Sequence, residues 1–406
     1  MRIVSLIFVT TLCTTVAAYS RDPSTRPDGN VVASMHDFTE ALKRARPGDT
    51  VQTPFTGLAT IPTLPLTISP VADAPQLLLA DQPEYFRTGD GISMQETVKP
   101  GLVRLYLYHV PEPTGKPKII SAVVENLGGA PMTIQFHRYA SPRPSGDYHK
   151  VATAAMQAFL QKQPAPDEIR LRQVAPNERL VIDPAIDQTA VKTDVLVHVF
   201  HEFSVDQAAR VTVFQRDPGA ESISAIDTLP KLPRVLEGFH ASGAGRGLFL
   251  TSEQTVAMSG EQAIDTADGP RALMIADGKT DPWIRGRDSI DPSTPAENKG
   301  NYGVIYRVNL RYRTSDGRRI ALLMAGHRPD NKWCRYTAAV ISVKNGDSPP
   351  ELVRMPGFGG RFDSLPQAVV IQTLPAMPPG QTGRVELTYS PPGACCLPTP
   401  ILMVPY

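Results

Sequence analysis

The sequence predicts an all-β protein built from two β-sandwich domains of immunoglobulin-like or related topology, with one helix inserted in the first. The 406 residues include 40 prolines, about twice the usual share of roughly 5%, and proline interrupts helices and central strands. Short segments with alternating apolar and polar residues recur roughly every ten residues, separated by turn residues. The length is sufficient for two ordinary domains.

Residues 1–18 have the features of a signal peptide. Arg2 provides a positive charge, a mostly apolar run follows over residues 3–16, and Ala17 and Ala18 precede the expected cleavage site. The run is too short to span a membrane comfortably. We therefore expect an exported chain, located in the periplasm, at the cell surface or in the medium, with no transmembrane segment in its mature form. The alternative is a buried N-terminal strand.

Residues 19–74 are expected to be an N-terminal extension or linker. A short helix is predicted over residues 37–45, capped by Ser34 or His36. Prolines then recur every few residues as far as Pro70, which is typical of an extended linker or an edge segment.

The first domain is predicted over residues 75–232. Its clearest part is 103–139, where three strands follow one another: VRLYLYHV, KIISAVVENL and PMTIQFHRY. In the first of these, Val103, Leu105 and Leu107 alternate with more polar residues, which predicts a strand with one buried face. The segments EIRLRQV, ERLVID, DVLVHVFHEF and RVTVFQRD continue the series.

One helix is predicted inside this domain, over residues 147–163. Its start can be capped by Ser145 or Asp147, and Pro164 ends it. We expect this helix to cover an open end or one face of the sheet. The residues at helical spacing are Tyr148, Val151, Ala152, Ala155, Phe159 and Leu160.

The second domain is predicted over residues 233–406, after a proline-broken linker at 227–238. Its clearest strand is VIYRVNLRYR, followed by Asp316-Gly317 and then RRIALLMAG, which predicts a hairpin. The segments AVVIQTL, GRVELTYS and PTPILMVPY follow. The polar residues 276–301 are expected to form a long solvated loop.

Five segments of the chain are QPEYF, VRLYLYHV, ENLGGAPMTI, VLVHVFHEF and GNYGVIYRV. They resemble a group of exported bacterial β-sandwich proteins, and the likeness extends over most of residues 75–406. The resemblance implies bacterial origin and β architecture. It implies no catalytic residue and no cofactor.

Charge and cysteine content narrow the classes of partner. The chain has 41 basic and 40 acidic residues. Because binding to nucleic acid needs a basic excess, no nucleic acid partner is expected.

The cysteines allow a disulfide. The mature chain keeps Cys334, Cys395 and Cys396. One disulfide is possible, most simply between Cys334 and one of the C-terminal pair. Their spacing does not suit a zinc site.

The histidines are the candidate metal ligands. His198 and His201 are three residues apart in a predicted strand, so they should face opposite sides of a sheet, unlike the helical pair of a zinc protease. We therefore expect structural or surface histidines, and we predict no cofactor, no metal site and no catalytic residue. A metal site would require convergence among His109, His137, His149, His198, His201 and Glu202.

The arginines are the most regular charged feature. Arg307, Arg311 and Arg313 project from one side of the predicted strand VIYRVNLRYR, where they could contact an anionic polymer such as an acidic polysaccharide. The alternative is a solvated outer face of the sheet.

Three weaker motifs are expected to be structural. Ile264-Asp265-Thr266-Ala267 resembles half of an aspartic protease site, which needs two such loops. The glycine-rich segment 242–247 leads into a strand, so it lacks the helix that a phosphate site needs. The acidic segment 277–291 lacks the regular spacing of a calcium loop.

The sequence therefore predicts an exported cell-envelope or extracellular protein with a non-catalytic binding or structural role through its sandwich surfaces. Its partner would be an envelope polysaccharide or another envelope protein. The alternative is a secreted hydrolase, with or without a metal, that acts on an envelope or extracellular polymer.

Overall fold

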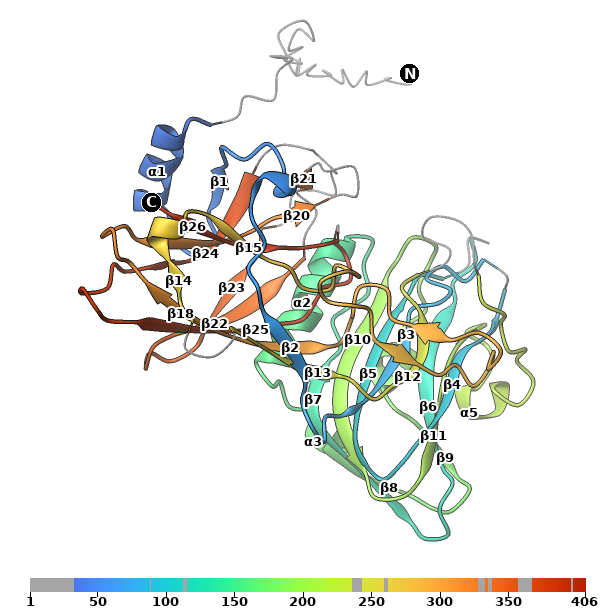
Figure 1. Ribbon diagram of the computed structural model, residues 1–406. Coiled ribbons are helices and arrows are strands. Elements are labelled where there is room, and N and C mark those ends of the chain that lie inside the picture. The colour runs from blue at the N-terminus through green and yellow to red at the C-terminus, as the bar shows by residue number, and fades with distance from the viewer. Residues whose placement is uncertain are drawn as a thin grey trace, which may run out of the picture. The chain divides into compact units, whose positions relative to one another are not determined.

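The structure is a computed structural model that describes residues 33–87, 89–111, 115–235, 243–258, 262–327, 333–334, 338–356, 367–395 and 397–406. Strands account for 42% and helices for 12%, which confirms the predicted all-β class. The sheets form two sandwiches, which we call the first and second sandwich (Figure 1).

The first sandwich consists of a sheet in the order β12-β3-β5-β10-β7-β8 and a sheet in the order β4-β11-β6-β9. Neighbouring strands are antiparallel except β3 and β5, which are parallel. The strands of the larger sheet are β3 (Gln76–Ala80), β5 (Gly101–His109), β7 (Met132–Ala140), β8 (Leu171–Val174), β10 (Val197–Val205) and β12 (Arg246–Phe249). Those of the smaller sheet are β4 (Gly91–Val98), β6 (Ile119–Asn126), β9 (Arg179–Val181) and β11 (Ala209–Arg216).

The core of the first sandwich confirms the predicted buried face of β5. Val103, Leu105 and Leu107 all lie in the apolar cluster between the two sheets. The other face of β5 is buried as well, with Tyr106 and Tyr108 in a different apolar cluster. The prediction of a single buried face was therefore wrong, because both sides of this sheet are covered.

The second sandwich consists of a sheet in the order β1-β24-β19-β26-β15 and a sheet in the order β2-β13-β18-β25-β22-β23, in which β14 also pairs with β18. The strands of the former are β1 (Thr50–Gln52), β15 (Arg271–Leu273), β19 (Ile320–Met324), β24 (Gln367–Leu374) and β26 (Ile401–Pro405). Those of the latter are β2 (Thr67–Pro70), β13 (Glu253–Ala257), β14 (Ile264–Asp265), β18 (Ile305–Arg313), β22 (Val340–Asn345), β23 (Glu351–Arg354) and β25 (Gly383–Tyr389). Two short pairs complete the strands: β16 (Arg285–Gly286) with β17 (Ala296–Glu297), and β20 (Gly326–His327) with β21 (Trp333–Cys334).

One apolar cluster runs from the second sandwich to the first. It joins inward residues of β18, such as Val308 and Leu310, to Tyr106 of β5 and Phe200 of β10. Contacts group residues 32–406 into one unit. The two sandwiches therefore share a continuous hydrophobic core.

Both predicted helices are present. The helix α1 (Met35–Arg44) begins after Ser34, whose Oγ accepts a hydrogen bond from the Asp37 backbone amide. It packs Phe38 and Leu42 against the outer face of the β1-β24-β19-β26-β15 sheet. The remaining helices are α2 (Tyr148–Leu160), α3 (Asp167–Arg170), α4 (Pro184–Asp187), α5 (Ser222–Ala225) and the 3₁₀ turns η2 (Leu58–Thr60) and η3 (Thr266–Asp268). In the described part of the chain, no helix has both the length and the apolar character needed to cross a membrane.

The helix α2 lies between the two sandwiches (Figure 1). Asp147 caps it by accepting a hydrogen bond from the Lys150 amide. Phe159 stacks on Phe200 of β10 with ring centroids 3.7 Å apart, while Thr153 donates a hydrogen bond to a carbonyl near the start of β22. The helix therefore covers one face of the first sandwich and also contacts the second.

The predicted hairpin at Asp316-Gly317 was wrong. The strands on either side, β18 and β19, belong to different sheets of the second sandwich. A turn closed by the Gly317 amide on the Thr314 carbonyl carries the chain from one sheet to the other. Because β19 is buried along its whole length, it is stabilised between β24 and β26 rather than beside the half-exposed β18.

Strand pairing also crosses the predicted domain limits. The predicted extension 19–74 supplies α1, β1 and β2, which pack on or pair with the second sandwich. Beyond the predicted limit at 233, β12 pairs with β3 in the first sandwich. Segments distant in sequence therefore complete the sheet edges.

Candidate functional site

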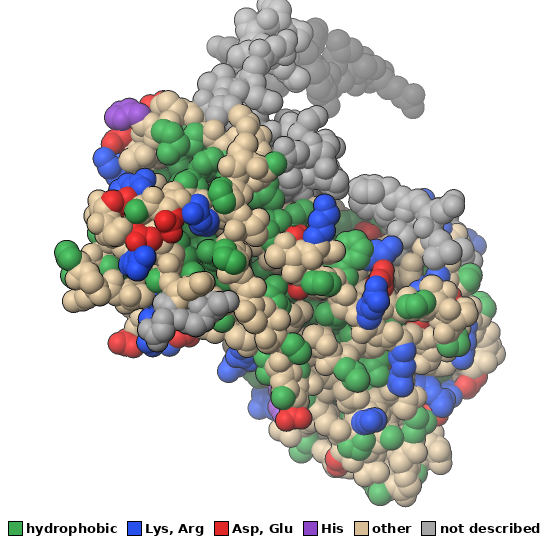
Figure 2. Space-filling model, in the orientation of Figure 1, with side chains coloured by type: hydrophobic (Ala, Val, Ile, Leu, Met, Phe, Trp, Pro, Cys, Tyr) green, Lys and Arg blue, Asp and Glu red, His purple; other side chains and the backbone are tan. Residues whose placement is uncertain are grey.

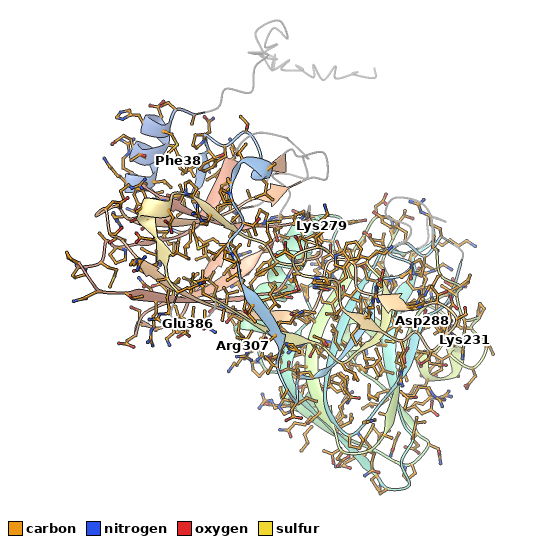
Figure 3. The ribbon with its side chains drawn as sticks, viewed as in Figure 1. Phe38, Lys231, Lys279, Asp288, Arg307 and Glu386 are labelled. Carbon is orange, nitrogen blue, oxygen red and sulfur yellow. The ribbon has the colours of Figure 1, made fainter. Side chains whose placement is uncertain are left out.

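The outward side of β18 and β25 carries four arginines, which we call the arginine face: Arg307, Arg313 and Arg384, which are exposed, and Arg311, which is half-buried. The alternation predicted for β18 is confirmed, because Tyr306, Val308, Leu310 and Tyr312 are buried while Asn309 faces outward with the arginines. The side chains of Arg307 and Arg313 are 53% and 59% exposed. Figure 3 labels Arg307 and Glu386 along this sheet.

Three acidic side chains described at this face form ion pairs, namely Glu253, Asp265 and Glu386. Arg307 Nη2 lies 2.7 Å from an oxygen of Glu253, and Arg313 Nε lies 2.6 Å from an oxygen of Asp265. On the next strand, Lys344 Nζ lies 3.3 Å from Glu386. The role found for Asp265 is structural, because it also accepts hydrogen bonds at the start of η3.

The strand register brings further positive charge together. Arg311 of β18 lies directly opposite Arg384 of β25, and Asn309 lies opposite Glu386. Like charges directly opposite each other on a sheet are destabilising. Sequence reasoning identified Arg311 but missed Arg384. The alternation in GRVELTYS shows that Arg384 faces outward, although its partner across the sheet cannot be found from local sequence.

Beneath one end of this face, Arg104 of β5 is fully buried and joins the two sandwiches. Its guanidinium donates to Glu202 of β10, at 2.7 Å from Nη2, and to Glu253 of β13, at 2.8 Å. Nη1 donates to the carbonyls of Ser252 and Gly303, at 2.7 and 3.3 Å. The arginine thus has acceptors in both sandwiches, which offsets the high cost of burying its charge.

The candidate metal ligand Glu202 accepts hydrogen bonds from Arg104 instead. Besides Arg104, it lies 3.3 Å from Arg138 Nε. Burial tends to raise the pKa of Glu253, but hydrogen bonds from Arg307 and Arg104 hold this pKa below its usual value. Both glutamates therefore serve as partners of arginine.

His198 and His201 face opposite sides of their sheet, as predicted. His198 Nδ1 donates to the Leu107 carbonyl at 2.7 Å, and its ring lies 4.7 Å from that of Tyr106. Burial lowers the pKa of His198 to about 4. His201 stacks on Tyr139 at 4.3 Å on the other side of the sheet.

The other candidate histidines lie at separate places. His109 is buried, with Nδ1 2.8 Å from the Pro83 carbonyl and Nε2 3.1 Å from Ser93 Oγ, and burial lowers its pKa to about 3. His137 is exposed on β7, with Nε2 3.0 Å from Ser204 Oγ, while His149 is buried in the first turn of α2. Within the residues described, no three His, Cys, Asp or Glu side chains are grouped to hold a metal ion.

His201 forms a buried pair with Asp183, at 3.1 Å from Nε2 to Oδ2. Burial would raise the pKa of Asp183, but its hydrogen bond and charge interaction with His201 lower this pKa to about 2. Asp183 also caps α4 through the amides of Ala185 and Ile186. The pair therefore holds a helix against the sheet.

A surface pocket of about 440 Å³ lies next to this pair. Tyr139 connects them, because it lines the pocket and stacks on His201. His201 itself is fully buried, so its ring is not presented to the pocket. The other lining residues are Ser141, Gln163, Pro164, Ala165, Pro166, Asp167 and Arg170.

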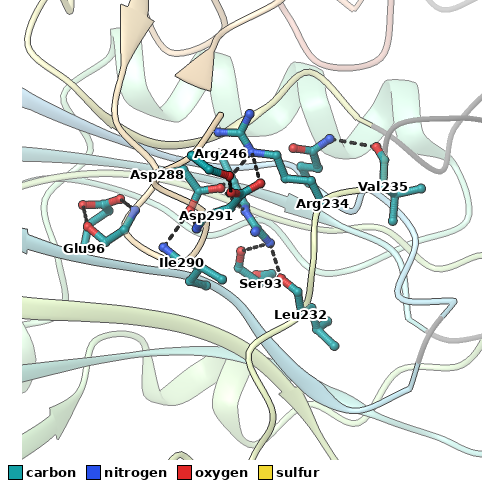
Figure 4. Close-up of polar contacts among 12 residues, drawn as sticks. Ser93, Glu96, Leu232, Arg234, Val235, Arg246, Asp288, Ile290 and Asp291 are labelled. Atoms are coloured by element: carbon teal, nitrogen blue, oxygen red, sulfur yellow. Dashed lines mark hydrogen bonds and ion pairs between the residues drawn. The ribbon is translucent and has the colours of Figure 1, made fainter. Parts of the chain in front are cut away.

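The acidic segment 277–291 is more buried than predicted. Asp288 is 3% exposed, and one of its oxygens accepts hydrogen bonds from Arg246 Nε at 2.7 Å and Arg234 Nε at 2.9 Å (Figure 4). Its other oxygen accepts from two backbone amides. Asp281 is 2% exposed and accepts from the Ala276 amide at 2.7 Å. The expectation of a solvated loop was therefore wrong for these two carboxylates, which hold the segment against the sandwiches.

Of the three candidate cysteines, only Cys395 has a described side chain. Its thiol is free and donates to the Pro392 carbonyl at 2.9 Å, and burial raises its pKa. The predicted pairing of Cys334 with Cys396 depends on the side chain of Cys334 and on residue 396, which lie outside the described part of the chain.

No family model matches this chain, and no curated protein matches it either. A solved structure described as the CUB1-EGF-CUB2 domain of human MASP-1/3 is similar at 8% sequence identity. The alignment covers 77% of this chain and 100% of that one, with a TM-score of 0.19. A similarity at this level carries no argument about fold or function.

Proposed function

We propose that this chain is an exported protein of the bacterial cell envelope or extracellular space. It binds its partner through an exposed sheet face, without catalysis. The observation that carries the proposal is the arginine face, an outward sheet surface with charged side chains in register. The finer fold proposal is that both sandwiches have immunoglobulin-like or related topology, supported by largely antiparallel sheets facing each other across a core.

The rigidity of the support favours a binding role. The sheet that carries the arginine face rests on the core that runs into the first sandwich. Arg104 adds a buried ionic connection beneath one end of the same sheet. A preorganised surface loses little conformational freedom when a ligand binds.

The export part of the proposal is tested with the full chain, carrying a C-terminal tag, in a bacterial host. The expected result is tagged protein outside the cytoplasm with Tyr19 as its first residue, because the apolar segment before Ala18 has signal-peptide features. Subcellular fractionation and N-terminal sequencing measure this. Recovery in the cytoplasm with residues 1–18 retained would show that the export proposal is wrong.

The hydrolase alternative is favoured by the Asp183–His201 pair beside the surface pocket. It requires a group that reaches substrate, and His201 is buried behind Tyr139. An equimolar transition metal retained after extensive dialysis, or release of sugars from isolated envelope material, would favour this alternative over non-catalytic binding.

A further inference from the structure

We infer that this chain forms a two-fold symmetric dimer through the open end of the larger sheet of the first sandwich. The inference goes beyond the proposed function and uses other residues than the arginine face. Three observations carry it: a partly exposed row of side chains across the sheet, the absence of charge in that row, and complementary residues on its two sides.

The cover over the outward side of this sheet ends part of the way along β10. Phe200 lies under α2, where Phe159 stacks on it. Glu202, the next outward residue, accepts hydrogen bonds from the buried Arg104. The following outward residue, Ser204, is partly exposed. The sheet is therefore open to solvent near this end of β10.

A row of uncharged side chains crosses the open end. Ser204 lies opposite Leu102 of β5 and Gln135 of β7, and Gln135 lies opposite Leu171 of β8. Residues directly opposite each other on neighbouring strands project from the same face of a sheet. These four residues therefore form one row, which we call the neutral row. Leu102 and Leu171, at its two ends, are 40% and 60% exposed.

The composition of the neutral row fits an interface between protein surfaces. The centres of such interfaces are depleted in charged residues, whereas charged side chains are spread over the surface seen in Figure 2. The described part of the chain exposes five large apolar side chains, and two of them belong to this row. A polyanion finds no base in the row, and a sugar ring finds no aromatic side chain there.

The symmetry of the row favours a second copy of this chain as the partner. In a two-fold dimer, a surface patch meets the same patch of the other copy. Because Leu102 and Leu171 lie in one row, a two-fold axis along that row, between two stacked sheets, brings each leucine against its own equivalent. The second sandwich joins the sheet on one side of the row, through Arg104 and Glu253. This axis therefore places the second sandwiches of the two copies at opposite ends of the dimer.

The residues on either side of the neutral row are complementary. His137 lies two residues beyond Gln135, on the same side of the row as Arg138, which contacts α2. Asp206 lies on the opposite side, where its carboxylate accepts a hydrogen bond from the Thr133 amide at 2.7 Å. The two-fold axis brings His137 of each copy toward Asp206 of the other. An imidazole N–H can donate to a carboxylate, so two such contacts would flank the leucines.

The test is sedimentation velocity of the purified mature chain at about 1 to 500 µM, which suits the weak association of a small interface. Two variants place opposite charges at one position, Leu102→Glu and Leu102→Lys. The matched controls are Leu250→Glu and Leu250→Lys, because Leu250 is 70% exposed and lies off the neutral row. Each variant is measured alone and in an equimolar mixture with its opposite. Circular dichroism checks that each variant is folded.

The wild type is expected to form dimers that dissociate on dilution. Each Leu102 variant alone should associate at least about tenfold more weakly, because like charges then face each other. The mixture of the two should recover to within about threefold of the wild type, and the Leu250 variants should stay within about twofold of it. His137→Glu, which brings a second carboxylate toward Asp206, should also weaken association by at least about threefold.

A wild type that stays monomeric over this range would overturn the inference, as would equal losses at positions 102 and 250. Leu102 variants that associate like the wild type would also overturn it, and would point instead to pairing along the edge strand β8, which lies three strands from Leu102. Folded Leu102 variants that remain monomeric when mixed would exclude the self-facing arrangement. If no Leu102 variant folds, unchanged association of His137→Glu would reject the dimer proposed here.

Discussion

His109 and His198 are uncharged core residues in this fold, despite their positions in suggestive sequence segments. Each is buried, and each has Nδ1 within hydrogen-bond distance of a backbone carbonyl. Because burial penalises the imidazolium, the pKa of both rings falls well below that of an exposed histidine. These histidines therefore affect how stability depends on pH, rather than ligand binding.

His198→Gln should reduce the loss of stability on mild acidification. The folded-state pKa of about 4 lies below the usual 6.5, so the unfolded chain takes up a proton first as the pH falls. The stability that the neutral His198 contributes is complete above pH 6.5 and is lost progressively as the pH falls toward about 4. At pH 5 the loss amounts to about 2 kcal/mol. Between pH 7.5 and pH 5, the unfolding free energy of the wild type should fall by about that much more than that of the variant.

Urea unfolding of both proteins at the two pH values provides the measurement. The unfolding free energy of each protein is compared between the two pH values, so the stability lost through altered packing in the variant cancels. An identical fall in both proteins would contradict a neutral buried His198.

At the scale of single elements, local pattern predicted β18 and α2 well. The alternation in β18 correctly identified its outward arginines, and both longer helices begin at residues named as caps, Ser34 and Asp147. The pairing between strands was predicted less well. The Asp316-Gly317 signal is a genuine turn, but it connects two sheets instead of two neighbouring strands. A turn signal determines where the chain reverses, whereas burial on both faces determines the sheet in which β19 lies.

Phe159→Ala in α2 should destabilise the protein by about 3 to 5 kcal/mol. Its ring is fully buried, stacks on Phe200 and lies beneath the guanidinium of Arg138, with 4.6 Å from Cζ to the ring centroid. Chemical unfolding measures the effect, with Gln161→Ala at the exposed end of the helix as the control. A loss below about 1 kcal/mol would mean that α2 is not required to hold this face of the sheet.

For the molecule as a whole, the two sandwiches behave as one packing unit. The shared apolar cluster and the contacts of Arg104 with Glu202 and Glu253 connect strands from both. Buried ion pairs contribute little compared with apolar replacements, but losing one partner leaves uncompensated charge. Arg104 is therefore expected to couple the stability of the first sandwich to that of the second.

Arg104→Met should cost about 3 kcal/mol of unfolding free energy. The variant leaves Glu202 with Arg138 and Glu253 with Arg307, but both carboxylates lose their buried donor. Calorimetry should show one transition for the wild type and a lower or divided transition for the variant. Lys43→Met, which removes an exposed ion pair, should change stability by less than about 0.5 kcal/mol. Equal effects of the two substitutions would contradict a coupling role for Arg104.

The sequence by itself determined the all-β class, both longer helices with their caps, the outward side of β18, and the opposite orientations of His198 and His201. These follow from spacing along the chain, because a strand alternates its side chains and a helix repeats its apolar face. Only the tertiary structure decided that Arg104 is buried, that Arg311 lies opposite Arg384, that β12 completes the first sandwich, and that the candidate histidines lie apart. Each of these depends on a partner far away in sequence, and the free energy that selects such a partner comes from burial and pairing across sheets, which local spacing does not encode.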